Sequence, residues 1–153
     1  MSSDCAPDES ELKEAAIRSL ARREHSVHEI RGKLLRRGGD GATVEAVVAG
    51  LQEAGLLSNQ RYAEQYCRSR ANRGHGPVRV LHDLQQQRLD EALIEEAMAP
   101  YEEKWLKILE DVRQRRFGEA YPESYPQWAK QARFLQQRGF TSEQINRVLR
   151  KAY

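Results

Sequence analysis

The sequence predicts an all-α protein, built as an elongated, curved array of three tandem three-helix repeats. Apolar residues are spaced as on helix faces throughout, and no segment alternates apolar and polar residues for long enough to indicate a strand. The 10 glycines and 5 prolines cluster between these helical stretches. With 31% charged and 39% hydrophobic residues over 153 positions, thin packed layers suit the composition better than one thick core.

One pattern recurs about every 50 residues. Overlaying 34–51, 84–101 and 135–152 places an apolar residue 10, 13, 14 and 17 positions after each leading leucine, which traces one helix face. Six positions after each leucine lies a residue that favours a helix N-cap. These residues are Asp40, Asp90 and Thr141. A unit of this size buries its apolar face better in a stack than alone, so the pattern predicts stacked repeats. The alternative is one compact helical bundle with coincidental periodicity.

Further helix starts define the limits of the repeats. The residues that predict them are Ser10, Ser26 with Glu29 as a capping box, Ser58, Pro77 at N1 and Pro126 at N1. The expected organisation is a disordered acidic tail over 1–9 and three-helix repeats over 10–57, 58–101 and 102–153.

The sequence contains no motif of an enzyme or a cofactor site. It has no phosphate-binding glycine loop, no HExxH and no CxxC. We interpret Gly74 to Pro77 as a flexible connection that leads into a proline-started helix. Cys67, His75 and His82 could approach one another, but a fourth zinc ligand is not evident. We therefore expect no catalytic residues, no cofactor and no metal.

The location and assembly of the protein are also expected from composition. No apolar run is long enough to cross a membrane, and the N-terminus lacks a secretion signal. Two cysteines do not make a disulfide framework, so both are expected to be reduced thiols. These features predict a cytoplasmic protein, which we expect to be a monomer.

Arginine dominates the basic residues, with 19 Arg against 6 Lys. Arginine grips phosphates and carboxylates in a bidentate manner, and here it is interleaved with aromatic residues, so the partner is expected to be a nucleic acid or another polyanion. The candidate contact residues are Arg68, Arg70, Arg73, Arg79, Arg36, Arg37, Arg115, Arg116, Arg133, Arg138, Arg147 and Arg150. The alternative is that most of them are ordinary solvated helix surface and that the aromatic residues belong to the core.

Three segments resemble the signatures of the bacterial RecX regulators. The first is His25-Ser26 with Glu29 and the stretch 34–38. The second is 55–64, followed by Arg68-Ser69-Arg70, 74–80 and Leu84. The third is 134–140 with Ile145 and Val148-Leu149. The chain departs from the family pattern at Arg88-Leu89, where Gly-Ile is common, and at Asn59, where Asp is usual.

The resemblance implies a regulator that binds the groove of the RecA–DNA filament and inhibits its ATPase, strand-exchange and coprotease activities, and so modulates recombination and the SOS response. Contact with single-stranded or double-stranded DNA is a further implication. Two other functions stay open: a DNA-binding helical module that acts by coating DNA, and a helical scaffold for another protein. Arg68, Arg70, Arg73 and Arg79 are the first contact candidates, because they share one basic block.

Overall fold

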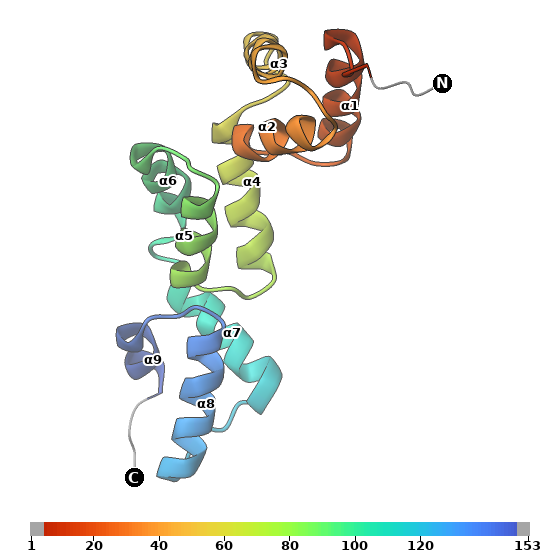
Figure 1. The fold of residues 1–153 in the computed structure, drawn as a ribbon. Helices are drawn as coiled ribbons and strands as arrows, with labels where there is room; N and C mark the ends of the chain where they lie inside the picture. Colours follow the sequence, from red (N-terminus) through yellow and green to blue (C-terminus); the bar gives the residue numbers. More distant parts are fainter. Residues whose placement is uncertain (1–4, 150–153) are drawn as a thin grey trace. The chain divides into compact units, whose positions relative to one another are not determined.

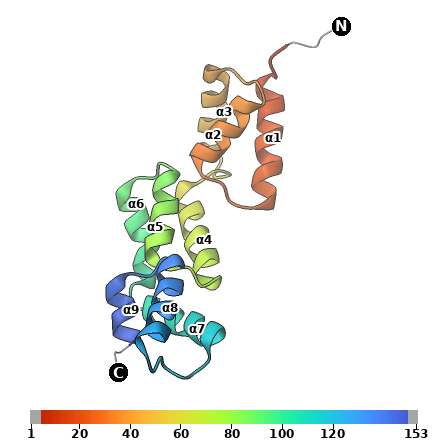
Figure 2. The same ribbon diagram turned by 60° about the horizontal axis from the view of Figure 1, so that its bottom comes forward.

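The computed structural model describes residues 5–149, which form nine α-helices and one short 3₁₀ helix and contain no strand (Figures 1 and 2). This confirms the all-α prediction. None of the helices in this part of the chain is long and apolar enough to span a bilayer.

The helices follow one another in groups of three. The first group is α1 (Glu9–Arg22), α2 (Val27–Arg36) and α3 (Gly41–Glu53). The second group is α4 (Asn59–Asn72), α5 (Pro77–Gln86) and α6 (Glu91–Met98), followed by the 3₁₀ turn η1 (Ala99–Tyr101). The third group is α7 (Trp105–Phe117), α8 (Tyr125–Gln137) and α9 (Ser142–Val148). We refer to the groups as repeats 1, 2 and 3.

The recurring apolar pattern forms the core of each repeat. The leading residues Leu34, Leu84 and Leu135 are all fully buried. Ten positions later, the side chains of Val44, Ile94 and Ile145 are buried too, and each lies on the third helix of its repeat. In each repeat the pattern therefore marks one buried leucine on the second helix and one buried aliphatic side chain on the third. Ala152, the last position of the third copy, lies outside the described residues.

Local capping starts most helices where the sequence predicts. Ser26 with Glu29 and Thr141 with Gln144 form complete capping boxes. Asp40 and Asp90 are N-caps, although the Asp90 side chain makes no capping hydrogen bond. Ser58 Oγ accepts a hydrogen bond from the amide of Arg61, and Pro77 is the first residue of α5. These ends are encoded within a few residues of sequence.

Two predicted helix starts are wrong by one or two residues. Helix α1 begins at Glu9 rather than at Ser10, because the Asp8 carboxylate accepts a hydrogen bond of 2.8 Å from the amide of Glu11 and so caps the helix. Glu9, which we placed in the tail, is therefore helical. Helix α8 begins at Tyr125 with Ser124 as its N-cap, so Pro126 is the second helical residue.

The turn after the second helix has the same backbone conformation in all three repeats. Four positions after the leading leucine, φ is +94° at Gly38, +56° at Arg88 and +99° at Gly139. This left-handed region costs glycine little but strains a residue with a Cβ. Arg88 is the only non-glycine residue with positive φ in the described part of the chain. The turn is therefore kept in repeat 2 although its glycine is missing.

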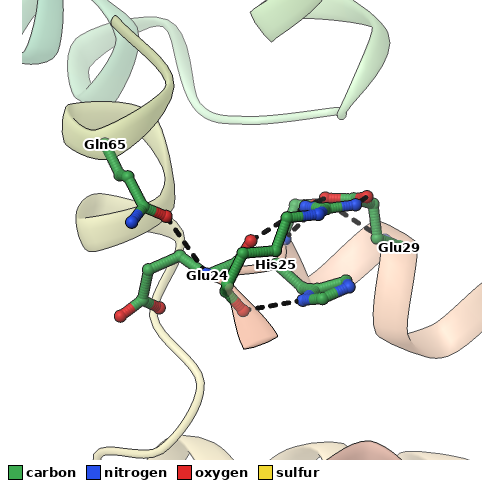
Figure 3. A network of polar contacts seen from close by, with 6 residues as sticks. Glu24, His25, Glu29 and Gln65 are labelled. Carbon is green, nitrogen blue, oxygen red and sulfur yellow. Dashed lines mark hydrogen bonds and ion pairs between the residues drawn. The ribbon is translucent and has the colours of Figure 1, made fainter. Parts of the chain in front are cut away.

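The chain divides into two compact units, 1–65 and 66–153, and the division falls inside α4. The first turns of α4 are bonded to repeat 1 (Figure 3). The amide of Glu24 donates a hydrogen bond of 3.1 Å to Gln65 Oε1, and the amide of Val27 donates one of 2.8 Å to Asn59 Oδ1. These contacts explain why the compact unit extends beyond repeat 1. They also give Asn59, a departure from the family pattern, a defined role as an acceptor.

Within the second unit, main-chain atoms join repeats 2 and 3. The amide of Gly76 donates a hydrogen bond of 2.8 Å to the carbonyl oxygen of Arg138. The amide of Val78 donates one of 2.9 Å to the carbonyl oxygen of Gly139. A Cβ on Gly76 would lie 2.5 Å from the Gly139 oxygen, and one on Gly74 would lie 2.5 Å from Val112 Cγ2. The segment 74–76 is buried, so the prediction of a flexible connection here is wrong. We call the main-chain contact of residues 74–78 with Arg138 and Gly139 the glycine joint.

Candidate nucleic-acid interface

Eleven of the twelve candidate arginines lie in the described residues, on helices or at their ends. Nine of these are exposed, and Arg70 and Arg138 are half-buried. Arg150 lies outside the described residues.

Three candidates from three different helices lie around one histidine. Arg70 is near the end of α4, Arg79 is in the first turn of α5, and Arg138 is the C-cap of α8. The glycine joint brings these helix ends together, because it bonds the turn before α5 to the turn after α8. The positive charges of all three arginines act on His75, which lies in the joint itself. We refer to Arg70, Arg79 and Arg138 as the joint cluster.

His75 is a buried, uncharged residue on which all three arginines of the joint cluster act. Its side chain is buried, and its Nδ1 atom has no hydrogen-bond partner among the described residues. Burial lowers the pKa of His75 below its usual value of 6.5, and the charges of Arg79, Arg70 and Arg138 lower it further, while Asp83 acts in the opposite direction. The imidazole is therefore uncharged at neutral pH, and the positive charge of the cluster is carried by its guanidinium groups.

Aromatic rings hold two of the arginines near this surface. The Arg70 guanidinium lies 5.0 Å from the ring centre of Tyr66, and the Tyr66 hydroxyl donates a hydrogen bond of 2.5 Å to Asp83. Arg138 and Arg116 lie 5.6 and 5.7 Å from the ring centre of Phe134. Such stacking fixes a guanidinium without neutralising its charge. Arg116 of α7 therefore adds a fourth cation through Phe134.

The first unit contains a second basic cluster, around Lys33 of α2. Burial lowers the pKa of Lys33, and the positive charges of Arg22, Arg37, Arg23 and Arg36 lower it further. The candidates Arg36 and Arg37 are exposed here, at the end of α2. Arg23 is instead paired with Glu29 at 2.7 Å.

The structure does not unite the other candidates with the joint cluster. Arg68 acts on Tyr101 at the end of repeat 2, Arg133 borders a groove between α8 and α9, and Arg147 borders a cavity between α7 and α9. Arg73 and Arg115 are exposed. The first group of contact candidates is therefore split, because Arg70 and Arg79 act on His75 together with Arg138 of repeat 3, while Arg68 acts on Tyr101.

One arginine of the basic, aromatic-rich segment at the end of α7 is part of the core. The Arg113 side chain is fully buried and is paired with Glu110 at 2.8 Å. It also donates hydrogen bonds to the carbonyl oxygens of Ala120 and Glu119 and lies 4.3 Å from the ring centre of Tyr121. Its position four residues after the buried Leu109 is the signal that could have indicated this role.

The residues considered for a metal site do not come together as one. Among residues 5–149, no group of three or more His, Cys, Asp or Glu side chains is arranged to hold a metal ion. Cys67 is buried and is not paired with the exposed Cys5. Burial raises the pKa of the Cys67 thiol to about 11, which keeps it protonated and unreactive.

The three repeats match three models of one family in order. The first, second and third three-helix domains of RecX match residues 13–51, 58–98 and 102–149. The chain belongs to the RecX family. The three-helix repeats are thus the RecX domains, and the glycine joint connects the second to the third.

Full-length relatives support the same assignment. The chain is 44% identical to the regulatory protein RecX of Halorhodospira halophila, over 88% of this chain and 83% of that protein. It is 42% identical to the regulatory protein RecX of Stenotrophomonas maltophilia, over 94% and 88%. The crystal structure of RecX from Lactobacillus salivarius has the same fold, with a TM-score of 0.78 over 94% of this chain and 96% of that one at 21% identity.

Proposed function

We propose that this protein binds the RecA–DNA filament and inhibits its ATPase, strand-exchange and coprotease activities, and so modulates recombination and the SOS response. It acts in the cytoplasm as a monomer, by occupying a binding site and without a catalytic step. The family assignment supports the direction of this proposal, since the relatives are regulatory proteins RecX.

The joint cluster is the observation that carries the proposal. Arg70, Arg79 and Arg138 come from two repeats, and a buried main-chain contact fixes the helix ends that hold them. Guanidinium groups held on a rigid scaffold lose little conformational entropy when they bind a partner. Their positive charges are complementary to a surface that carries fixed negative charges. A recombinase filament on DNA offers such charges on its acidic side chains and on the phosphates.

The test is filament ATPase turnover titrated with the protein on preformed filaments. Changing Arg70, Arg79 and Arg138 together to Gln should raise the concentration needed for half-inhibition at least tenfold, because three charge-assisted contacts are removed. The matched control replaces Lys13, Arg18 and Lys107 with Gln. These three cations are exposed and do not act on His75. It should inhibit like the parent.

Equal inhibition by the cluster variant and the parent, at equal helical content, would contradict this placement. The amount of protein needed also reports on the mode of action. Inhibition far below one molecule per recombinase subunit indicates binding at filament ends, and near-stoichiometric inhibition indicates binding along the groove.

A second function, coating of single-stranded or double-stranded DNA, is favoured by the two basic clusters. It predicts binding to bare DNA that weakens steeply with salt, by about 0.9 decades of affinity per decade of salt for each phosphate neutralised on a duplex. Comparing bare and recombinase-coated DNA at physiological salt separates the two functions. Tighter binding to the coated DNA supports the filament regulator.

A further inference from the structure

The main chain of the glycine joint holds the arginines of the joint cluster at the turn that contains His75, or directly against it. The amide of His75 donates a hydrogen bond of 3.0 Å to the carbonyl oxygen of Arg70, and the next residue, Gly76, is bonded to that of Arg138. Arg79 packs against the partner turn, since its Cβ lies 2.5 Å from the position of a Cβ built on Gly139. Three helix ends therefore meet at one histidine.

The charges that act on His75 are mostly positive. They are Arg70 of α4, Arg79 and Asp83 of α5, and Arg138 at the end of α8. Helix α7 also contacts the joint, through the apolar side chain of Val112. Three cations and one acid leave an excess of positive charge at the joint, which an anion can compensate.

His75 is able to take up a proton at this place. Its side chain is 6% exposed, and its Nδ1 atom has no hydrogen-bond partner among residues 5–149. The imidazole can therefore gain a proton without giving up a hydrogen bond of Nδ1. Burial and the positive charges of the three arginines oppose this proton. An anion bound to the arginines removes the second of these causes.

We propose that the joint cluster binds neighbouring phosphates of a nucleic-acid strand and that His75 takes up a proton when they bind. A strand carries a negative charge at every phosphate, so neighbouring phosphates can match several clustered cations. Each guanidinium can bind a phosphate in a bidentate manner. The proton then adds a further positive charge to the site. This inference rests on the joint cluster being the binding surface, as proposed above, and it adds the ligand and a dependence on pH.

Proton uptake makes binding tighter at lower pH. The phosphodiester groups of DNA stay charged near neutral pH, so a pH dependence of binding comes from the protein. Linkage limits the effect of one proton to tenfold in affinity per pH unit. Partial uptake by His75 should give about threefold tighter binding at pH 6 than at pH 7.5.

The first test measures binding of a fluorescent thymidine oligomer of twenty units at these two pH values and low salt. The parent should show the threefold ratio, and His75→Gln should show a ratio closer to one. His82→Gln is the matched control, because His82 is an exposed histidine of α5. It should keep the ratio of the parent. Circular dichroism checks that each variant is folded.

Proton NMR follows the same step in the parent, so the result does not depend on the folding of a histidine variant. The pKa of His75, read from its carbon-bound ring protons, should rise when the oligomer is added. Arg79→Gln should raise this pKa in the free protein and weaken binding, because it removes one of the charges that lower the pKa. Lys107→Gln also removes one exposed cation and should leave the pKa of His75 unchanged.

An unchanged His75 pKa in the complex with the oligomer would overturn this inference. Filament inhibition by the joint-cluster variant is measured separately, so the proposed regulation would still stand. Proton uptake with the recombinase filament but not with the oligomer would overturn the phosphate assignment and identify acidic side chains as the anions. Failure of the parent to bind the oligomer at low salt would overturn the phosphate site even if filament inhibition is retained.

Discussion

The amide of Gly76 donates its hydrogen bond to the carbonyl oxygen of Arg138, 2.8 Å away, although the two residues lie in different repeats. The same contact brings the Arg138 side chain into the group of cations around His75. Stability of the second unit and the geometry of the candidate interface therefore depend on one turn-to-turn contact. A substitution that opens this contact should affect both.

Gly76→Ala should destabilise the protein by about 1–3 kcal/mol, because the added Cβ would lie 2.5 Å from the backbone of Gly139 and the joint must shift. Urea unfolding measures this loss, and hydrogen exchange should locate it at the joint. Gly50→Ala in α3 is the control. No atom outside its own stretch of helix backbone lies within 4 Å of its added Cβ, so it should stabilise by about 0.5–1 kcal/mol. A neutral Gly76→Ala would contradict the close packing of the joint.

Arg88→Gly should stabilise the protein by about 0.5–1 kcal/mol. It relieves the left-handed backbone at φ +56°, and the greater freedom of glycine in the unfolded chain cancels part of the gain. Arg88→Ala removes the same side chain but keeps the Cβ, so its free energy of unfolding should not increase. Equal effects of the two variants in thermal unfolding would show that the side chain, rather than the backbone, sets the stability here.

Arg113→Ala should cost roughly 3 kcal/mol, because it leaves Glu110 and two carbonyl oxygens without the buried guanidinium that they share. Arg115→Ala, two residues further along α7 and exposed, should change stability by less than about 0.5 kcal/mol. Chemical unfolding followed by circular dichroism measures both. A mild effect at Arg113 would mean that water or a neighbouring side chain replaces these contacts.

The stability of the protein should fall as the pH drops below about 6.5. His75 has a lowered pKa in the folded state and its ordinary value of 6.5 when unfolded, so the unfolded chain binds more protons in this range. The stabilisation is complete above pH 6.5 and is lost as the pH falls toward the pKa of the folded state. Burial lowers the pKa of His25 in the same direction, so this residue contributes as well.

His75→Gln isolates the contribution of the joint to this pH dependence. Its urea midpoint should vary less between pH 7.5 and pH 5 than that of the parent, while the part due to His25 remains. Parallel curves for the two proteins would show that His75 does not titrate with unfolding.

Sequence reasoning was most successful where the determining contacts are local. The capping boxes at Ser26 and Thr141 involve residues three positions apart, and the buried leucines recur at a fixed interval, so both are readable along the chain. The sequence predicts a start of α1 at Ser10, whereas Asp8, an equally good cap residue two positions earlier, starts the helix at Glu9. Choosing between neighbouring caps depends on energy differences too small to read from a pattern.

The candidate interface could be predicted only as a list of arginines. Arg70 and Arg138 are distant in sequence, and both act on His75 because two turns with glycine at the contact positions pack backbone to backbone. Nothing in the spacing of charges encodes that contact. The candidates from α7 were Arg115 and Arg116, which are on its surface, but no role was predicted for Arg113 of the same helix, which is buried in a complete set of partners.

The geometry of a junction held by main-chain hydrogen bonds depends little on the exposed side chains around it. Provided that positions 74, 76 and 139 remain glycine, the exposed positions around the junction can change in size and polarity without changing how the second repeat meets the third. The surface above the junction can then be re-tuned for a different partner by substitution alone, at little risk to the architecture that presents it.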